Sequence, residues 1–393
     1  MIKIESLDHN GRGIGRLNNK IVFVNNALPN EIVEIKPISE KKNYIEANVT
    51  RYIDKSEKRV DSICPYYEYC GGCDLLHMSY IDQLEFKQNK ISNIIYKYLN
   101  KDIKVNKIVK SDIEFNYRNK VTFHVDNKIG FFKDKTNNII EIKKCFLADK
   151  KINDAIEHLN KLDLKNINEI TCRVGNNKLM IIINSNKDID TTPIEDIASS
   201  IYLNNRLVYG EKTIDSIIGN YKYIISPKSF FQININVCEK LYNKIKEETN
   251  NSKNILDLYC GTGSISIYVS ENKNVFGIEI NESAISDANV NASINNIDNI
   301  KFICGDSGKM SNNLNFKPDT IIVDPPRNGL DSITIKNILS MNPNKIIYVS
   351  CDPMTLTRDL KILSTNYIIR DVTPFDMFPQ TKHVENMAIL LKK

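Results

Sequence analysis

The carboxyl-terminal part of the chain, from about residue 226, alternates short β-rich runs with runs of helical periodicity. Its first unit is a strand pattern at 254–258, which leads into a glycine-rich turn and then a helix pattern. Strands that alternate with helices are typical of a doubly wound α/β sheet, in which ligands bind beyond the carboxyl ends of the strands. We therefore predict an α/β domain over residues 226–393 and expect its functional residues where the strands end.

The first two predicted strands of this domain end in residues suited to a nucleotide-like ligand. The turn Cys260-Gly261-Thr262-Gly263 lets such a ligand approach the backbone, but the third glycine of a pyrophosphate fingerprint is missing, which disfavours NAD. The second strand ends in Glu279, about 20 residues further on, where an acid holds a ribose diol. Together these features fit S-adenosylmethionine. Asp306 follows the third strand and is placed to reach an adenine edge, with an ordinary surface acid as the alternative.

Two later strand patterns end in residues suited to catalysis. Asp324 precedes two prolines, and a rigid Pro-Pro turn fixes its carboxylate within reach of a substrate base or the cofactor. Cys351 follows the β-rich run 346–349, where an ionised thiol can act as a nucleophile; a buried, unreactive cysteine is the alternative. Near the end of the chain, His383 and Glu385 lie two residues apart and supply two candidate bases.

The first 55 residues contain short β-rich runs separated by Gly and Pro turns. This pattern predicts a small barrel of the OB type, a common platform for nucleic acids. The chain has 53 Lys and Arg against 48 Asp and Glu, a net charge of +5 that permits a polyanionic partner without requiring one. Basic residues of the barrel are candidate phosphate contacts, and the alternative is that they are ordinary solvated residues. They are Arg12, Arg16, Lys20, Lys41, Lys42 and Arg51.

A short segment after the predicted barrel concentrates thiols. Cys64, Cys70 and Cys73 flank two adjacent glycines, which let the backbone turn tightly enough for the thiols to converge on a metal. Cys145 is the best candidate for a fourth ligand, with His77 as the alternative. All-thiolate ligation suits either zinc or an iron–sulfur cluster, and the spacing does not separate the two. Nine cysteines in an intracellular chain argue against a disulfide framework.

Residues 56–225 combine strand and helix patterns, and we predict a mixed α+β central domain. A helix is expected at 79–99, with Ser79 as its N-cap, followed by a strand at 178–183 and a helix at 194–203. No apolar run is long enough to span a membrane, and the N-terminus lacks the apolar region of a signal peptide. We therefore expect a cytoplasmic monomer without a membrane partner.

These motifs resemble those of the TrmA/RumA-type RNA (uracil-5-)-methyltransferases. The resemblance covers nearly the whole chain, and its blocks occur in the order of that family. They are Ser229-Phe230-Phe231-Gln232-Ile233-Asn234, Asp257-Leu258-Tyr259-Cys260-Gly261-Thr262-Gly263, Asp324-Pro325-Pro326-Arg327-Asn328-Gly329, Ser350-Cys351-Asp352-Pro353 and Phe375-Asp376-Met377-Phe378-Pro379-Gln380-Thr381-x-His383-x-Glu385.

The resemblance implies a Rossmann-like methyltransferase domain at 226–393 and a TRAM domain at 1–55. Since TRAM domains occur in the ribosomal-RNA members and not in the tRNA-directed ones, it favours 23S rRNA over tRNA as the substrate. It also implies that the helix at 79–99 packs on the catalytic domain. The same resemblance assigns a [4Fe-4S] cluster to four ligands, Cys64, Cys70, Cys73 and Cys145.

The resemblance further implies a role for each residue of the active site. Cys351 is the expected nucleophile that adds to uracil C6, and Glu385 is the expected base that removes the C5 proton. The residues expected to contact S-adenosylmethionine or shape its pocket are Gln232, Tyr259, Glu279 and Asp324. An amino-group methyltransferase and an inactive RNA-binding assembly factor are the competing interpretations, and neither needs Cys351 or Glu385.

Overall fold

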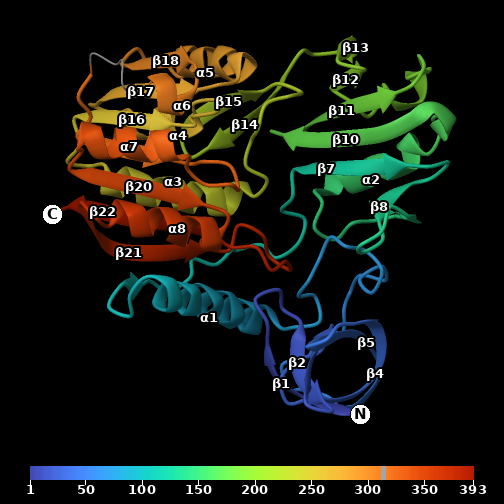
Figure 1. The fold of residues 1–393 in the computed structure, drawn as a ribbon. Coiled ribbons are helices and arrows are strands. Elements are labelled where there is room, and N and C mark those ends of the chain that lie inside the picture. The colour runs from blue at the N-terminus through green and yellow to red at the C-terminus, as the bar shows by residue number, and fades with distance from the viewer. Residues whose placement is uncertain (311–315) are drawn as a thin grey trace. The chain divides into compact units, whose positions relative to one another are not determined.

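A computed structural model describes residues 1–310 and 316–393 of the chain (Figure 1). The chain forms two compact units. Unit 1 comprises Met1–Lys90, Phe131–Ile140 and Phe378–His383, and unit 2 comprises Ile91–Gly130, Glu141–Met377 and Val384–Lys393. The domain limits expected from the sequence, 1–55, 56–225 and 226–393, remain a prediction.

A closed five-stranded barrel begins unit 1 (Figure 1). Alternate side chains of its strands point inward and form a core that includes Ile4, Val22 and Val33. A Cβ on Gly15 would lie 2.6 Å from the Lys3 carbonyl oxygen, so only glycine fits there. The predicted N-terminal barrel is confirmed. In hydrogen-bonded order its strands are β1 (Ile2–Leu7), β2 (Gly13–Leu17), β3 (Lys20–Asn25), β5 (Tyr44–Asp54) and β4 (Ile32–Glu40).

The cysteine segment, which contains Cys64, Cys70 and Cys73, follows the barrel and leads into helix α1 (Tyr80–Tyr98). Ser79 caps this helix, because its hydroxyl accepts a hydrogen bond from the Asp82 backbone N–H at 3.3 Å. The predicted helix at 79–99 therefore exists with its expected cap. The boundary between the two units falls within the helix, after Lys90.

The largest sheet of unit 2 has eight strands and helices on its faces (Figure 1). Among the described strands of this sheet, seven run in one direction and β22 runs in the opposite one, and the strand order reverses between β16 and β19. The doubly wound α/β fold predicted for this region is confirmed. In order, the strands are β18 (Ile300–Cys304), β17 (Asn274–Glu279), β16 (Asn254–Leu258), β19 (Thr320–Val323), β20 (Lys345–Ser350), β22 (Glu385–Lys392), β21 (Tyr367–Phe375) and β6 (Lys104–Val105).

Helices connect the parallel strands, and most begin at a side chain that caps them. Asp352, for example, accepts hydrogen bonds from the Met354 and Thr355 backbone N–H groups at 2.9 Å each, directly after Cys351. The helices are α3 (Ile235–Glu248), α4 (Ser264–Val269), α5 (Glu282–Ile294), α6 (Ser307–Met310), α7 (Ser332–Met341) and α8 (Pro353–Leu363).

A second, seven-stranded sheet comes from the central part of the chain, together with helix α2 (Lys150–Leu159) and the hairpin of β14 (Ile214–Ile218) and β15 (Tyr221–Ile225). This mixture of helix and strand agrees with the predicted α+β character. Its strands, in order, are β13 (Arg206–Gly210), β12 (Ser200–Leu203), β11 (Lys178–Ser185), β10 (Ile167–Gly175), β7 (Lys120–Val125), β8 (Ile129–Phe132) and β9 (Ile139–Glu141).

The helix predicted at 194–203 is wrong. The structure has a short 3-10 helix at Thr192–Ile194 and then strand β12, whose four residues are all buried. β12 pairs in parallel with β11, so both of its faces pack in the interior. A short, continuously apolar run has no period that separates a buried strand from a helix, and tertiary pairing decided the outcome.

Candidate active site

The predicted site residues of unit 2 lie at one edge of the eight-stranded sheet. Tyr259, Glu279 and Asp324 follow or end β16, β17 and β19, and Cys351 directly follows β20. This edge contains the point at which the strand order reverses, between β16 and β19. Ligands of open α/β sheets bind at such a switch point, because the loops there diverge and leave a crevice.

The turn after β16 is built from residues in the left-handed backbone region. Gly261 and Gly263 have φ values of 55° and 75°, and Tyr259 has a φ of 64°. A positive φ is rare and costly for an aromatic residue, and such strain concentrates at functional sites. A Cβ on Gly263 would lie 2.5 Å from the Phe302 ring, whereas one on Gly261 would meet no atom within 4 Å. Gly263 is therefore needed for packing, and Gly261 faces open space.

Glu279 joins this turn to the next strand. One of its carboxylate oxygens accepts from the Gly261 N–H at 3.2 Å, and the other accepts from the Asn281 N–H at 2.9 Å. The Tyr259 hydroxyl lies 3.3 Å from the Thr334 hydroxyl. An open glycine turn beside an acid at a strand end fits the nucleoside part of S-adenosylmethionine.

Asp257, inside β16, is a buried acid to which the sequence analysis gave no separate role. One carboxylate oxygen accepts from the Ser266 hydroxyl at 2.6 Å, and the other is buried without a partner among the described residues. Burial raises the pKa of Asp257 to about 7. A carboxyl in the apolar strand run 254–258 was the signal that could have identified it.

Cys351 and Glu385 are brought together by strand register. Antiparallel pairing of β20 with β22 sets Ser350 opposite Asn386, so one further step places Cys351 opposite Glu385. The Asn386 side chain donates to the Ser350 carbonyl at 3.3 Å and fastens the two strands at this point. The chain thus brings the Cys351 thiol near enough to the Glu385 carboxyl for the carboxyl to raise the pKa of the thiol.

Burial and neighbouring charges favour the protonated forms of Cys351, Glu385 and Asp324. Burial and the charge of Glu385 raise the pKa of the Cys351 thiol to about 11, against the lowering effect of Arg327. Burial also raises the pKa of Glu385 and of Asp324 well above the usual carboxyl range, and the two groups disfavour each other's ionisation. The arrangement can hold a proton near the thiol and exchange it with a carboxyl group.

A buried carboxylate on α8 braces the loop that carries Asp324. One oxygen of Asp359 accepts from the Leu330 N–H at 2.8 Å and from the Tyr348 hydroxyl at 2.7 Å, and the other accepts from Arg358 Nε at 2.8 Å. A Cβ on Gly329, whose φ is 71°, would lie 2.5 Å from Asp359. These hydrogen bonds of Asp359 were not predicted from the sequence, because Asp359 belongs to an ordinary amphipathic helix pattern.

The remaining predicted residues are less closely tied to this centre. Gln232 is buried, and its backbone carbonyl accepts a hydrogen bond from the Asn119 side chain at 2.9 Å. Asp306 is exposed and accepts from the Lys309 N–H at 2.9 Å. Of the two candidate bases, Glu385 belongs to unit 2 with Cys351, whereas His383 belongs to unit 1, where its ring lies 6.1 Å from that of Phe378.

The four predicted metal ligands are partly exposed cysteines. Cys64, Cys70 and Cys73 belong to unit 1 and Cys145 to unit 2. Within residues 1–310 and 316–393, no three His, Cys, Asp or Glu side chains form a group that could hold a metal ion. The geometry of the described chain therefore does not by itself define a metal centre.

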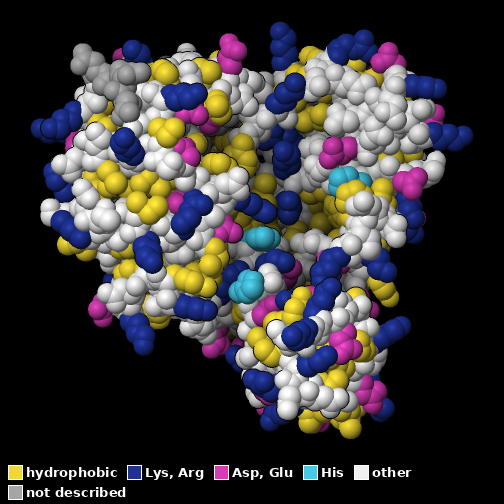
Figure 2. All heavy atoms as spheres, in the orientation of Figure 1, with side chains coloured by type: hydrophobic (Ala, Val, Ile, Leu, Met, Phe, Trp, Pro, Cys, Tyr) yellow, Lys and Arg dark blue, Asp and Glu magenta, His cyan; other side chains and the backbone are white. Residues whose placement is uncertain are grey.

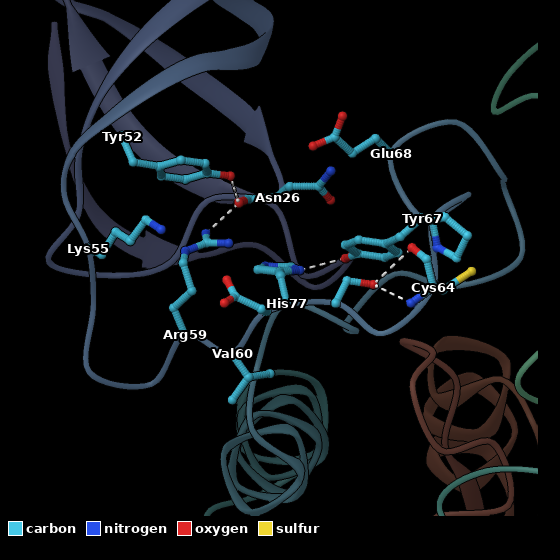
Figure 3. A pocket seen from close by; sticks show the side chains of 12 residues that line it. Asn26, Tyr52, Lys55, Arg59, Val60, Cys64, Tyr67, Glu68 and His77 are labelled. Atoms are coloured by element: carbon cyan, nitrogen blue, oxygen red, sulfur yellow. Dashed lines mark hydrogen bonds between the residues drawn. The ribbon is translucent and has the colours of Figure 1, made fainter.

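A cavity of about 360 Å³ lies in unit 1, beside the first of these cysteines (Figure 3). The Arg59 guanidinium covers the Tyr52 ring at 4.3 Å and donates to Glu31, while the Tyr67 hydroxyl donates to the Asp74 carbonyl at 2.9 Å. His77 Nδ1 lies 2.5 Å from that hydroxyl, and burial lowers the pKa of His77 to about 3. The imidazole is thus neutral and serves the packing of this segment.

The barrel's basic residues divide into paired and exposed groups. Arg12 donates to Asp8 at 2.8 Å and Glu46 at 2.7 Å, and Lys20 pairs with Glu40 at 2.7 Å. The exposed members are Arg16, which also pairs with Glu5 at 3.9 Å, and Lys41, Lys42 and Arg51. Figure 2 shows Lys and Arg side chains on the visible face of the barrel. In the described part of the chain, no helix has the length and apolar character needed to cross a membrane.

Comparison with known proteins agrees with this site. Residues 199–393 match the family model described as tRNA (Uracil-5-)-methyltransferase, and residues 1–50 match the TRAM domain. An uncharacterised RNA methyltransferase of Clostridium acetobutylicum is 35% identical over 99% of this chain and 96% of its own length. One from Clostridium tetani is 34% identical over 98% of this chain and 95% of its own length.

The solved structures include a similar enzyme from Pyrococcus abyssi, a tRNA (uracil-54, C5)-methyltransferase in complex with S-adenosyl-L-homocysteine. The two sequences are 30% identical, the alignment covers 100% of this chain and 99% of the Pyrococcus chain, and the TM-score is 0.83. The fold and the site define an S-adenosylmethionine-dependent RNA methyltransferase. More specifically, the chain belongs to the RNA (uracil-5-)-methyltransferase family, as its sequence motifs predicted.

Proposed function

We propose that this enzyme methylates C5 of a specific uridine in 23S rRNA through a covalent bond between Cys351 and uracil C6. The observation that supports the proposal is the register of β20 and β22, whose last pair is Ser350 with Asn386, next to Cys351 and Glu385 in the chain, together with the effect of Glu385 on the pKa of the Cys351 thiol. A methyltransferase that acts on an amino group needs neither residue. We further propose that the enzyme acts as a monomer in the cytoplasm.

The chemistry requires a nucleophile and a base because uracil C5 is a weak carbon nucleophile. The Cys351 thiol and the Glu385 carboxyl first lose their protons to solvent. The Cys351 thiolate then adds to C6, and the electron pair of the C5–C6 double bond shifts toward the C4 carbonyl, so that C5 becomes nucleophilic and bonds to the methyl group, whose bond to the sulfonium sulfur breaks. After methylation, the Glu385 carboxylate removes the C5 proton, the double bond forms again and the C6–S bond breaks. Cys351 leaves as a thiolate, and the proton passes from Glu385 to solvent.

S-adenosylmethionine supplies an electrophilic methyl group on a sulfonium when it is bound. Glu279 would hold its ribose diol, and the open side of Gly261 would leave room for the nucleoside. Tyr259, Gln232 and Asp324 would complete the pocket. The target base must leave its stack to reach Cys351, at a cost of about a few kcal/mol that is smallest in a loop.

Transfer RNA is the second candidate substrate. The Pyrococcus abyssi structure, whose name specifies tRNA uracil-54, covers the whole of this chain, including the barrel. A barrel at the N-terminus therefore does not separate ribosomal from transfer RNA. The choice of 23S rRNA therefore comes from the family resemblance alone, and an assay with both RNAs decides between the two substrates.

Methyl incorporation from labelled S-adenosylmethionine into purified 23S rRNA and tRNA tests this proposal. We expect 5-methyluridine at a single position of 23S rRNA, and loss of at least about 10³-fold activity in Cys351→Ala. Cys304→Ala removes an exposed thiol from the same unit and serves as the control. Methylation of tRNA alone would overturn the substrate, and methylation of a base amino group would overturn the reaction.

We also propose that Cys64, Cys70, Cys73 and Cys145 bind a [4Fe-4S] cluster. The family resemblance supports this proposal, and all four cysteines are partly exposed, unlike the buried Cys172 and Cys238. The thiol and carboxyl steps above move only electron pairs, so the cluster is not needed for methyl transfer. Anaerobically purified protein should contain iron and acid-labile sulfide, and Cys73→Ser should lose both. Purified protein without iron would contradict the assignment.

A further inference from the structure

The loop between β21 and β22 leads directly to Glu385, the first residue of β22. Its middle part, Phe378–His383, belongs to unit 1, where helix α1 and residues 74–78 hold it. Gln380, in the centre of this segment, has a φ of 70°. A left-handed backbone at a residue other than glycine persists only where surrounding contacts impose it.

Gln83 on helix α1 supplies those contacts. Its side-chain nitrogen donates to the Gln380 side-chain oxygen at 2.8 Å, and its side-chain oxygen accepts from the Gln380 backbone N–H at 3.0 Å. The same nitrogen reaches the Leu75 and Met78 carbonyls at 3.1 and 2.9 Å. Gln83 is fully buried, so loss of its side-chain amide would leave buried polar groups without these hydrogen bonds.

Two further contacts fix the ends of the same segment. Lys87, one turn along α1 and fully buried, donates to the Phe378 carbonyl at 3.0 Å. Lys382 donates to Asp74 through its backbone N–H at 3.1 Å and through its side chain at 3.0 Å. The segment is therefore held at its beginning, centre and end, and only His383 and Val384 separate Lys382 from Glu385.

We infer that Gln83 is a positioning residue for Glu385: through its paired hydrogen bonds with Gln380, it fixes the loop that delivers the base to the methylated adduct. This inference rests on the proposed function. Gln83 touches no reacting atom and acts through the backbone of the loop. Proton abstraction from C5 needs the carboxylate within hydrogen-bond reach, so a small displacement of the base slows that step.

The step at which Gln83 acts gives its variants a distinctive signature. Cys351 addition and methyl transfer precede proton abstraction, and the inference leaves both unchanged. Loosening of the loop therefore stalls the enzyme after the first methyl transfer, with Cys351 still bonded to the RNA. A defect in folding or RNA binding would instead reduce the amount of adduct and turnover together.

The experiment compares wild type, Gln83→Leu and Lys87→Met on unmodified substrate RNA. Both variants should lower steady-state turnover by about 10-fold or more, leave the first methyl transfer within about 3-fold, and accumulate a denaturation-resistant protein–RNA adduct. Glu85→Gln is the matched control on the exposed face of α1, where it removes only an ion pair with Lys58. Lys87→Met preserves side-chain bulk and gives an independent answer if Gln83→Leu does not fold.

Turnover at the wild-type rate, or equal loss of turnover and of the first methyl transfer, would overturn the inference. Wild-type enzyme with 5-fluorouridine-substituted RNA separates this failure from failure of the proposed function. If the wild type forms a Cys351-dependent adduct with that RNA but the variants accumulate none with unmodified RNA, only the role of Gln83 falls. If the wild type forms no adduct, the proposed reaction falls with it.

Discussion

The edge of the eight-stranded sheet and the cysteine segment of unit 1 place their functional side chains in different ways. At the sheet edge, Glu279, Asp324 and Cys351 each end or follow a strand, so the parallel pairing of the strands fixes their order in space. Cys64 and Cys73 lie in loops, outside any strand, helix or turn. Positions set by a sheet follow from sequence patterns, whereas the convergence of loop residues depends on contacts that those patterns do not contain.

Substitution of the proposed base is expected to have the largest effect. Glu385→Gln keeps the shape of the side chain but removes its ability to accept the C5 proton, so turnover should fall by about 10²-fold to 10⁴-fold. The thiol step precedes this loss, and a methylated protein–RNA adduct should accumulate in denaturing gels. His383→Gln is the comparison, since His383 was the other candidate base. A larger loss in His383→Gln than in Glu385→Gln would reassign the base.

The brace on α8 tests whether the sheet edge needs support from outside its strands. Asp359→Ala leaves the Leu330 N–H and the Tyr348 hydroxyl without their buried acceptor. We expect a loss of about 2–4 kcal/mol in unfolding free energy, with weaker cofactor binding. Asp352→Ala removes only a helix cap and should cost about 1 kcal/mol. Equal effects in chemical denaturation would show that the hydrogen bonds of Asp359 stabilise the protein no more than a helix cap does.

A barrel variant tests whether the barrel of unit 1 can be perturbed without an effect on the sheet edge of unit 2. Gly15→Ala places a Cβ against the Lys3 carbonyl oxygen and should destabilise the barrel by about 1–3 kcal/mol. We expect weaker RNA binding and unchanged affinity for S-adenosylmethionine, measured by calorimetry. Loss of cofactor affinity would show that the sheet edge depends on the barrel.

The smallest expected effect is a change in the pH dependence of stability. The pKa of Asp257 is raised to about 7 in the folded protein, so between its ordinary value of 3.8 and that value the folded state holds a proton that the unfolded state has lost. Stability should therefore fall as pH rises through this window and level off above it. Asp257→Asn should flatten that slope in melting temperatures measured from pH 4 to pH 8. An unchanged slope of melting temperature against pH would show that a group other than Asp257 binds this proton.

The sequence predicted the doubly wound sheet, the barrel and the strand-end residues because each depends on local periodicity and chain order. The helix expected at 194–203 failed, since β12 takes its structure from pairing with β11. Gln83 and Gln380 are 297 residues apart, and no local pattern connects them. Asp359 was missed for the same reason, because its partners come from β20 and the loop after β19.

The most direct measurement is a trapping experiment with RNA that contains 5-fluorouridine, followed by peptide mapping of the adduct. Fluorine at C5 cannot leave as a proton, so the reaction should stop with the RNA bonded to the enzyme. The account predicts one S-adenosylmethionine-dependent adduct on the peptide that contains Cys351, absent in Cys351→Ala and retained in Cys304→Ala. An adduct on another residue, or methyl transfer without any adduct, would contradict it.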